Sequence, residues 1–335
     1  MNVENSLIND KSEELMNLYK CIKTNEKEFF KQLNEIYRNW RLLEKVVESN
    51  SIELLKIYRQ YCNKLDENKN LKSIKTKFND KIYDFVISHA DEFNGVLCAE
   101  FNIEIDNFIN EISKNLISKM NRMYKLENEK GKMQEEDTLD NIECAFKSAF
   151  YMHFRHLYNE HEKLEINTSF YTAIFYFIRE FCYASMFRYN RNGKFNVPYG
   201  GISYNRKEFS KKIEYINSKK IRDYMSKTEL YTLDFEEFLD KINPKDGDFI
   251  FLDPPYDTEF STYAKNEFHK QDQIRLCEYL KKTKANFMLI IKNTDFIYSL
   301  YNNKSFNIKV FDKKYLVSFQ NRNDKDVEHL LITKG

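Results

Sequence analysis

The four consecutive residues Asp253, Pro254, Pro255 and Tyr256 form the stretch of the sequence best suited to chemistry. The carboxylate of Asp253 and the carbonyl of Pro254 are both hydrogen-bond acceptors, so together they can take the two hydrogens of an exocyclic amino group on a flat base. The ring of Tyr256 adds a face on which such a base can stack. A four-residue match is a modest signal, and the same stretch also fits a strand followed by a proline turn.

The apolar run Phe249–Leu252 precedes these residues and predicts a buried parallel strand. Proline cannot donate to a β-ladder and restricts the residue before it to extended conformations, so we expect the chain to leave the sheet at Asp253. Ligands of open α/β sheets bind at the carboxyl ends of the strands. The carboxylate of Asp253 is therefore predicted to lie at a ligand-binding edge.

The composition predicts a soluble cytoplasmic protein with no membrane partner. The chain has 335 residues, enough for one large domain or two ordinary ones, and a formal net charge of +1. No apolar run is long enough to span a bilayer, and the N-terminus does not resemble a signal peptide. The six cysteines are scattered without a close pair, which favours reduced thiols and argues against a metal site. The histidines 153, 156 and 161 are predicted to lie on helix faces rather than to bind metal.

The first half of the chain is predicted to be mostly helical. All four prolines lie in the second half, and only two of the seven glycines come before residue 190. Apolar residues recur at helical spacing through this half, and two further helices, the second very aromatic, are expected after Cys144. The charged range 125–140 is predicted to be a solvent-exposed connection.

The range 187–201 predicts a hairpin. Asn192 and Gly193 lie between two short aromatic or apolar runs, a pattern typical of a tight turn in which both residues have positive φ. The tip of this hairpin would carry three cations, Arg188, Arg191 and Lys194.

The range 188–222 is strongly basic. It holds ten Lys or Arg and two acids, a net charge of +8, which leaves −7 for the rest of the chain. This asymmetry predicts a face that binds the phosphates of nucleic acid. The alternative is a solvated basic surface, and the hairpin favours the first interpretation.

Three segments together resemble the Dam-like (D12 class, α-group) DNA adenine-N6 methyltransferases: the range 187–201, the turn 253–256 and the tail with Arg322, Asn323 and 328–333. In that family the hairpin belongs to target recognition and the D-P-P-Y turn to catalysis, in this order along the chain. The resemblance covers roughly 1–35 and 145–333. It implies an α/β fold with a Rossmann-like sheet and S-adenosylmethionine as the methyl donor.

The resemblance also implies roles for single residues. Asp10 resembles the acid that binds the ribose hydroxyls of S-adenosylmethionine, and Asp234 with Phe235 resembles the pair beside its adenine ring. Asp253 belongs to both the cofactor-binding and the catalytic set, with Pro254, Pro255 and Tyr256 as the rest of the catalytic set. The DNA-binding set is Tyr183, Arg188, Asn190, Arg191 and Lys194. Ala184 stands where the family has asparagine, so specificity for GATC is not implied.

One family motif has no counterpart. The glycines of the Phe-x-Gly-x-Gly turn let the backbone approach the methionine part of the cofactor, and none of the seven glycines supplies this pattern. The chain is therefore expected to begin inside the second strand of the fold. Three explanations stay open: an internal start of a longer reading frame, a separate polypeptide that supplies the segment, or loss of methyl transfer. The last would leave a non-catalytic DNA-binding remnant.

The predicted organisation follows from these assignments. The ranges 1–40 and 226–335 are expected to form a catalytic domain without its first strand, 41–140 a helical insertion, and 141–225 a target-recognition region. Strands are expected near 5–9, 229–233, 248–253, 286–292, 306–311, 314–319 and 328–333, and the last two are expected to pair as an antiparallel hairpin. The unpaired strand edges predict weak cofactor binding and aggregation. The partners implied by the resemblance are double-stranded DNA and a restriction endonuclease encoded nearby.

Overall fold

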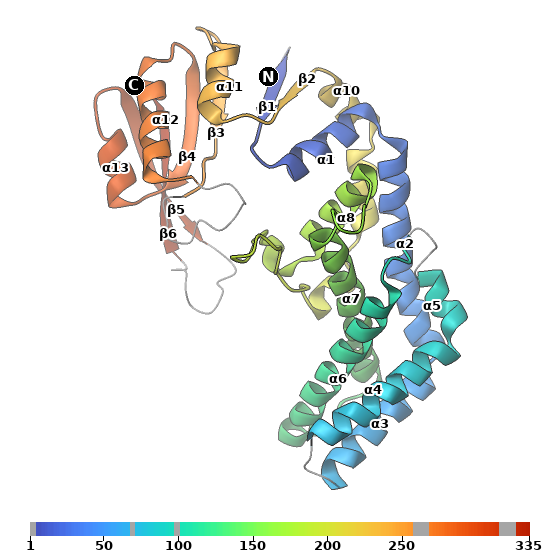
Figure 1. Ribbon diagram of the computed structural model, residues 1–335. Coiled ribbons are helices and arrows are strands. Elements are labelled where there is room, and N and C mark those ends of the chain that lie inside the picture. The colour runs from blue at the N-terminus through green and yellow to red at the C-terminus, as the bar shows by residue number, and fades with distance from the viewer. Residues whose placement is uncertain (1–4, 68–70, 97–100, 257–267, 315–325) are drawn as a thin grey trace. The chain divides into compact units, whose positions relative to one another are not determined.

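The computed structural model describes residues 5–67, 71–96, 101–256, 268–314 and 326–335, and they form two compact units (Figure 1). Unit 1 comprises residues 1–19, 188–193 and 227–335, and unit 2 comprises 20–187 and 194–226. All strands that the structure describes lie in unit 1. The fold is thus of mixed α/β type, as predicted, and mostly helical.

Unit 2 is built around long amphipathic helices. Its helices are α2 (Lys27–Ser49), α3 (Ser51–Glu67), α4 (Leu71–Ser88), α5 (Ala90–Val96), α6 (Ile105–Lys130), α7 (Glu135–Asn159), α8 (Thr168–Phe181), α9 (Phe209–Ile216) and α10 (Lys219–Ser226), while α1 (Glu13–Thr24) continues into it from unit 1. The fully buried Trp40 of α2 is surrounded by aromatic rings of α7, of α8 and of the loop after α8. Such ring contacts add to the free energy of burying apolar area. The predicted helical character of the first half is confirmed.

The prediction of an exposed connection over 125–140 is wrong for most of that range. Helix α6 continues to Lys130 and α7 begins at Glu135. Charged residues on the outer faces of two long helices account for the polarity that suggested a loop. The connection itself is short because Gly131, with φ of 94°, ends α6.

A buried ammonium group lies in the core of unit 2. The side chain of Lys147 is fully buried, and its Nζ donates to Oε1 of Glu44 at 2.6 Å and to the carbonyl of Asn205 at 2.6 Å. It also pairs with Oε1 of Glu143 at 3.0 Å and lies 5.1 Å from the centre of the Trp40 ring. A buried charge is stable only with such a full set of partners, so Lys147 ties α2, α7 and the segment around residue 205 together.

Unit 1 contains two sheets. In the first, β1 (Ser6–Asn9) pairs in parallel with β2 (Thr228–Tyr231). The second has the order β3-β4-β6-β5, in which β3 (Phe249–Leu252) and β4 (Asn286–Lys292) are parallel and β6 (Asp326–Lys334) is antiparallel to both β4 and β5 (Phe306–Lys314). The strands expected near 5–9, 229–233, 248–253 and 286–292 are confirmed.

The prediction of the terminal hairpin is wrong in its first strand. The antiparallel partner of β6 is β5, in register from Phe306↔Lys334 to Lys314↔Asp326. Alternate apolar residues from Phe306 onward extend this strand, so 306–311 is the first arm of the hairpin. The rest of the strand expected at 314–319 lies outside the described residues.

Helices cover one face of the larger sheet. Buried residues of α12 (Lys270–Lys282) and α13 (Asp295–Tyr301) pack against Phe287, Leu289 and Ile291 of β4. On β3, in contrast, Phe249 and Phe251 are 56% and 59% exposed. Neither β1 nor β3 has a second strand partner among the residues that the structure describes.

Candidate active site

The turn 253–256 lies directly after the carboxyl end of β3, where the prolines were predicted to end the strand. The side chain of Asp253 is exposed, and within the described part of the chain no donor reaches the carbonyl of Pro254. Both groups of the predicted amino-group site thus lie at the edge of the sheet, directly after β3. This geometry suits two hydrogen bonds to one nitrogen of a base.

Two buried polar residues hold this turn from the interior. Gln273, in the first turn of α12, donates from Nε2 to the carbonyl of Pro255 at 2.9 Å. His329 of β6 lies with its Nε2 3.2 Å from the hydroxyl of Tyr256, and the two rings meet edge to face. The sequence assigned no role to either residue. His329 belongs to the tail segment 328–333, whereas no motif includes Gln273.

The carboxyl ends of β1 and β2 are fastened to each other. The side-chain amide of Asn9 donates to the carbonyl of Leu233 at 3.1 Å and accepts from its N–H at 2.9 Å. Asp10 follows β1, and its Oδ1 accepts from the N–H of Ser12 at 2.7 Å. Its other oxygen has no partner within the described ranges, so the carboxylate can still accept a hydroxyl group.

Asp234 has a different environment. It caps α11 (Phe235–Ile242) by accepting from the N–H of Glu236, and it forms ion pairs with Lys11 at 3.3 Å and Arg275 at 3.2 Å. Burial raises the pKa of Asp234, but hydrogen bonds from Arg275, Glu236 and Lys11 outweigh this and keep it below the ordinary value. The Arg275 guanidinium also lies 4.7 Å from the centre of the Phe235 ring. Both residues of the predicted adenine-binding pair are therefore engaged by the protein itself.

The predicted two-residue hairpin turn is wrong in detail. The turn runs from Asn190 to Gly193: the N–H of Gly193 donates to the Asn190 carbonyl at 2.9 Å, and the N–H of Asn192 donates to Oδ1 of Asn190 at 2.9 Å. Gly193 has a φ of 69°, whereas Asn192 is not among the described residues with positive φ. The side-chain acceptor of Asn190 stabilises this turn, which is shifted by one residue from the predicted position and has Arg191 and Asn192 as its central residues.

Tyr183 lies next to strained backbone. Ala184 and Ser185 both adopt positive φ, 55° and 53°, in a 3-10 turn (Tyr183–Ser185) after α8. The N–H of Tyr183 donates to the carbonyl of Pro198 at 2.8 Å, and Cys182 forms a β-bridge with Tyr199. Such strain persists only where surrounding contacts impose it and is frequent at functional sites.

Acids from other parts of unit 2 neutralise much of the basic range 188–222. Five of its ten cations form ion pairs: Lys194 with Glu160, Arg206 with Glu143, Lys207 and Lys212 with Glu180, and Lys211 with Glu208. Three of these four acids lie outside the range, so a count along the sequence missed them. Within the described part of the chain, the exposed Arg191, Lys219 and Lys220 have no ion-pair partner. The set of cations without an ion-pair partner is therefore smaller than the charge count along the sequence suggested.

The three clustered histidines have separate partners. Burial lowers the pKa of His153 to about 4, and Asn107 bonds to its Nδ1 at 3.2 Å. His156 pairs with Glu104, and His161 stacks on Tyr171 at 3.9 Å. Among the described residues, no group of three His, Cys, Asp or Glu side chains is placed to hold a metal ion.

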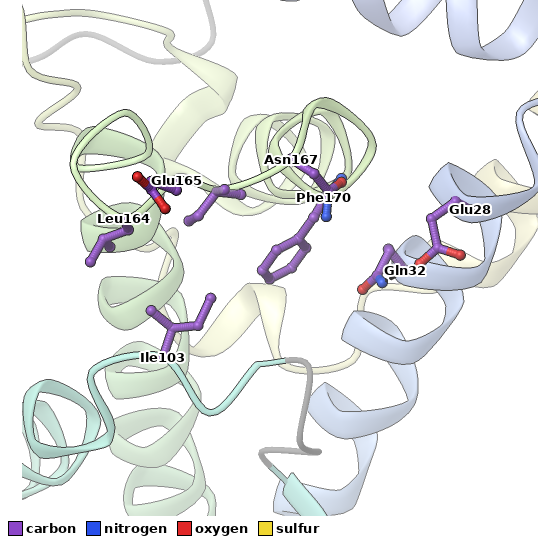
Figure 2. Close-up of a pocket in the computed structure, with 8 residues that line it drawn as sticks. Glu28, Gln32, Ile103, Leu164, Glu165, Asn167 and Phe170 are labelled. Atoms are coloured by element: carbon purple, nitrogen blue, oxygen red, sulfur yellow. Dashed lines mark hydrogen bonds between the residues drawn. The ribbon is translucent and has the colours of Figure 1, made fainter.

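Unit 2 also contains a pocket that is remote in sequence from the turn 253–256. It has a volume of about 310 Å³ and is lined by Glu28, Gln32, Ile103, Leu164, Glu165, Ile166, Asn167 and Phe170 (Figure 2). It contains two carboxylates and no cation, so it does not suit a phosphate group.

Of the helices that the structure describes, none is long and apolar enough to cross a bilayer.

Comparisons with known proteins agree with the motifs. The model of the D12 class N6 adenine-specific DNA methyltransferase family matches residues 96–317. The chain is 38% identical over 142 residues to the type II methyltransferase M.CviBI of Paramecium bursaria Chlorella virus NC1A, which covers 42% of this chain and 51% of that protein. It is 32% identical over 170 residues to the type II methyltransferase M.MjaIII of Methanocaldococcus jannaschii, covering 48% and 56%. It is also 30% identical over 169 residues to the Retron Ec67 DNA adenine methylase of Escherichia coli, covering 48% and 54%.

The extent of these matches adds two facts. The chain spans about half the length of the curated relatives it matches. The family match begins at residue 96, within the range 41–140 that was expected to be an insertion. Helix α6, which packs along α7, therefore falls inside the matched region.

Proposed function

The chain belongs to the D12 class of N6 adenine-specific DNA methyltransferases, whose model matches residues 96–317, and we propose that it transfers a methyl group from S-adenosylmethionine to N6 of an adenine in duplex DNA. The observation that carries this proposal is the turn 253–256, with an exposed carboxylate and an open carbonyl at the end of β3. The target base must first leave the helix, and the ring of Tyr256 offers it a stacking surface.

The chain's own residues act on the nucleophile. The lone pair of adenine N6 is delocalised into the ring, so the nitrogen is a poor nucleophile in the planar amine. Hydrogen bonds from N6 to Asp253 and to the Pro254 carbonyl favour a pyramidal nitrogen with its lone pair directed out of the ring plane. When bound, S-adenosylmethionine supplies the electrophilic methyl carbon of its sulfonium. Positioning is therefore the main source of rate acceleration.

The residues present fit one part of this cofactor. Asp10 keeps a carboxylate oxygen for a ribose hydroxyl. Asp234 already forms ion pairs with Lys11 and Arg275, and the Arg275 guanidinium lies over the ring of Phe235. No glycine directly follows β1 or β2. The ribose end is accommodated, whereas the methionine end lacks its glycine turn among these residues. We also propose that the two sheets, β1-β2 and β3-β4-β6-β5, belong to a single Rossmann-like sheet.

Transfer of labelled methyl from S-adenosylmethionine to duplex DNA tests the function. Digestion of the product to nucleosides should place the label in N6-methyl-2′-deoxyadenosine. Label in cytosine or in protein would refute the proposal. A restriction endonuclease encoded nearby is the partner we propose, and cleavage of host DNA that is protected by prior methylation would identify it.

The lack of a glycine turn favours a second candidate function, DNA binding without methyl transfer. Titration calorimetry of the purified chain with S-adenosylmethionine separates the two functions. Saturable binding supports the enzyme, while DNA binding in the absence of cofactor binding supports the alternative.

We assign 1–40 and 226–335 to catalysis, 41–140 to a helical insertion and 141–225 to target recognition.

Replacing Arg188 is expected to relax DNA specificity. If Arg188 contacts a base edge, Arg188→Ala should weaken the free energy of binding to the preferred site by about 1–3 kcal/mol, and to other sequences by much less. The exposed Lys220 has no ion-pair partner among the described residues, so Lys220→Ala should weaken binding to all sequences alike. Binding assays on a library of duplexes measure both. Equal losses on every sequence for Arg188→Ala would mean that it contacts only phosphate.

A further inference from the structure

We propose that His329 is a positioning residue that fixes the ring of Tyr256 for stacking against the flipped adenine. This inference rests on the proposed function, since it concerns how the same site holds its base. His329 is fully buried in β6, and its Nε2 lies 3.2 Å from the hydroxyl of Tyr256. The hydroxyl donates to the ring in one tautomer and accepts from it in the other.

The sheet topology brings these two residues together although 73 positions separate them. Strands β3 and β4 are parallel and β6 is antiparallel to β4, so the start of β6 lies at the edge where β3 ends. His329 pairs with Lys292 at the last position of β4. Tyr256, four residues beyond the end of β3, reaches His329 at that edge.

The three residues that follow His329 in β6 are apolar. Leu330 and Ile332 are fully buried next to it, and the Phe311 ring lies 5.8 Å from the imidazole. A buried polar group in such a place costs free energy unless it is hydrogen-bonded. The hydroxyl of Tyr256 gives the imidazole a polar contact in this place.

Most of the buried polar residues that the structure describes in unit 1 contact the turn 253–256. The structure describes three of them in this unit, Thr228, Gln273 and His329, and two of the three contact the turn. Gln273 holds the carbonyl of Pro255, and His329 holds the hydroxyl of Tyr256. These two contacts fix the backbone and the aromatic ring, and neither uses the acceptors at Asp253 or Pro254.

A double-mutant cycle tests the assignment. His329→Leu should lower kcat for methyl transfer roughly tenfold, with little change in the KM for DNA, because one buried hydrogen bond is lost. Tyr256→Phe should have an effect of similar size. The combined variant should lose little more than either single variant, since both remove the same contact. His329→Gln keeps a side-chain donor and acceptor and should restore part of the rate.

Two further measurements separate positioning from a merely structural role. A duplex with 2-aminopurine at the target position should show weaker flipping fluorescence with His329→Leu, and Ile332→Val, in the same strand but away from the turn, should leave it unchanged. The tyrosine 13Cζ resonance that disappears in Tyr256→Phe should shift in His329→Leu. Multiplicative losses in the double variant, or an unshifted resonance, would overturn the proposal.

The outcomes also distinguish the two levels of inference. A wild-type chain that methylates no adenine refutes the proposed function and the positioning role with it. Normal adenine methylation together with independent effects of the two substitutions refutes only the role of His329.

Discussion

Asp253→Ala is expected to lower the rate of methyl transfer to DNA by at least about 10²- to 10³-fold, the usual effect of removing one preorganised electrostatic group from an active site. The carboxylate is exposed at the end of β3, so its removal opens no cavity in the core. We expect the unfolding temperature and DNA affinity to stay close to the wild-type values. Single-turnover transfer of labelled methyl measures the chemical step.

A matched control comes from the same connection to β3. Asp246 is exposed, and Asp246→Ala should leave the rate unchanged. Asp253→Asn keeps one acceptor oxygen but replaces the other with a donor, so it should lose most of the activity as well. Methyl transfer by Asp253→Ala at near wild-type rate would show that the base is held by other groups.

Lys147→Met is expected to destabilise unit 2 by up to about 3–5 kcal/mol, because it removes the buried cation between Glu44 and Glu143 and leaves them only the partly exposed Arg41 and Arg206. The lysine side chain is fully buried between Glu44 and Glu143, whose side chains are 19% and 6% exposed. The carbonyl of Asn205 loses its donor in the same step. Chemical denaturation monitored by the fluorescence of Trp40, which lies beside Lys147 and is the only tryptophan, reports the change directly.

The control for this prediction is a surface lysine of the same unit. Lys114 pairs with Glu111 one turn away on α6, and its side chain is 69% exposed, so Lys114→Met should change stability by less than about 1 kcal/mol. Adding Glu44→Gln to Lys147→Met should recover part of the loss, since it removes one of the two carboxylates that Lys147 compensated. A loss for Lys147→Met no greater than that for Lys114→Met would mean that water compensates the buried charges.

Local patterns located the elements that depend on neighbouring residues. The apolar run before Asp253 predicted the position of β3, but the burial predicted for this strand is wrong, because Phe249 and Phe251 are exposed. The family resemblance predicted β1 before Asp10. The two prolines after Asp253 fixed where β3 stops. The helical first half followed equally well from the scarcity of glycine and proline.

Features that depend on distant residues could not be predicted in this way. His329 and Gln273 reach the turn 253–256 only after the sheet has formed, and no spacing in the sequence marks them. The basic range 188–222 looked uniformly charged because its counter-charges, such as Glu180, lie on other helices. The turn at Asn190 was misassigned because a side-chain hydrogen bond, rather than the Asn-Gly pair, sets its position.

The two exposed phenylalanines of β3 affect how long the chain survives in a cell. Phe249 and Phe251 show more than half of their surface on a strand whose second edge has no partner among the described residues. Quality-control chaperones and proteases act on exposed apolar segments, so abundance depends on how much of the time this strand is covered. A polypeptide that covers β3 would lengthen the half-life of the chain without any change in its synthesis. Protein turnover, measured by pulse labelling, thus becomes a readout of assembly that needs neither DNA nor cofactor.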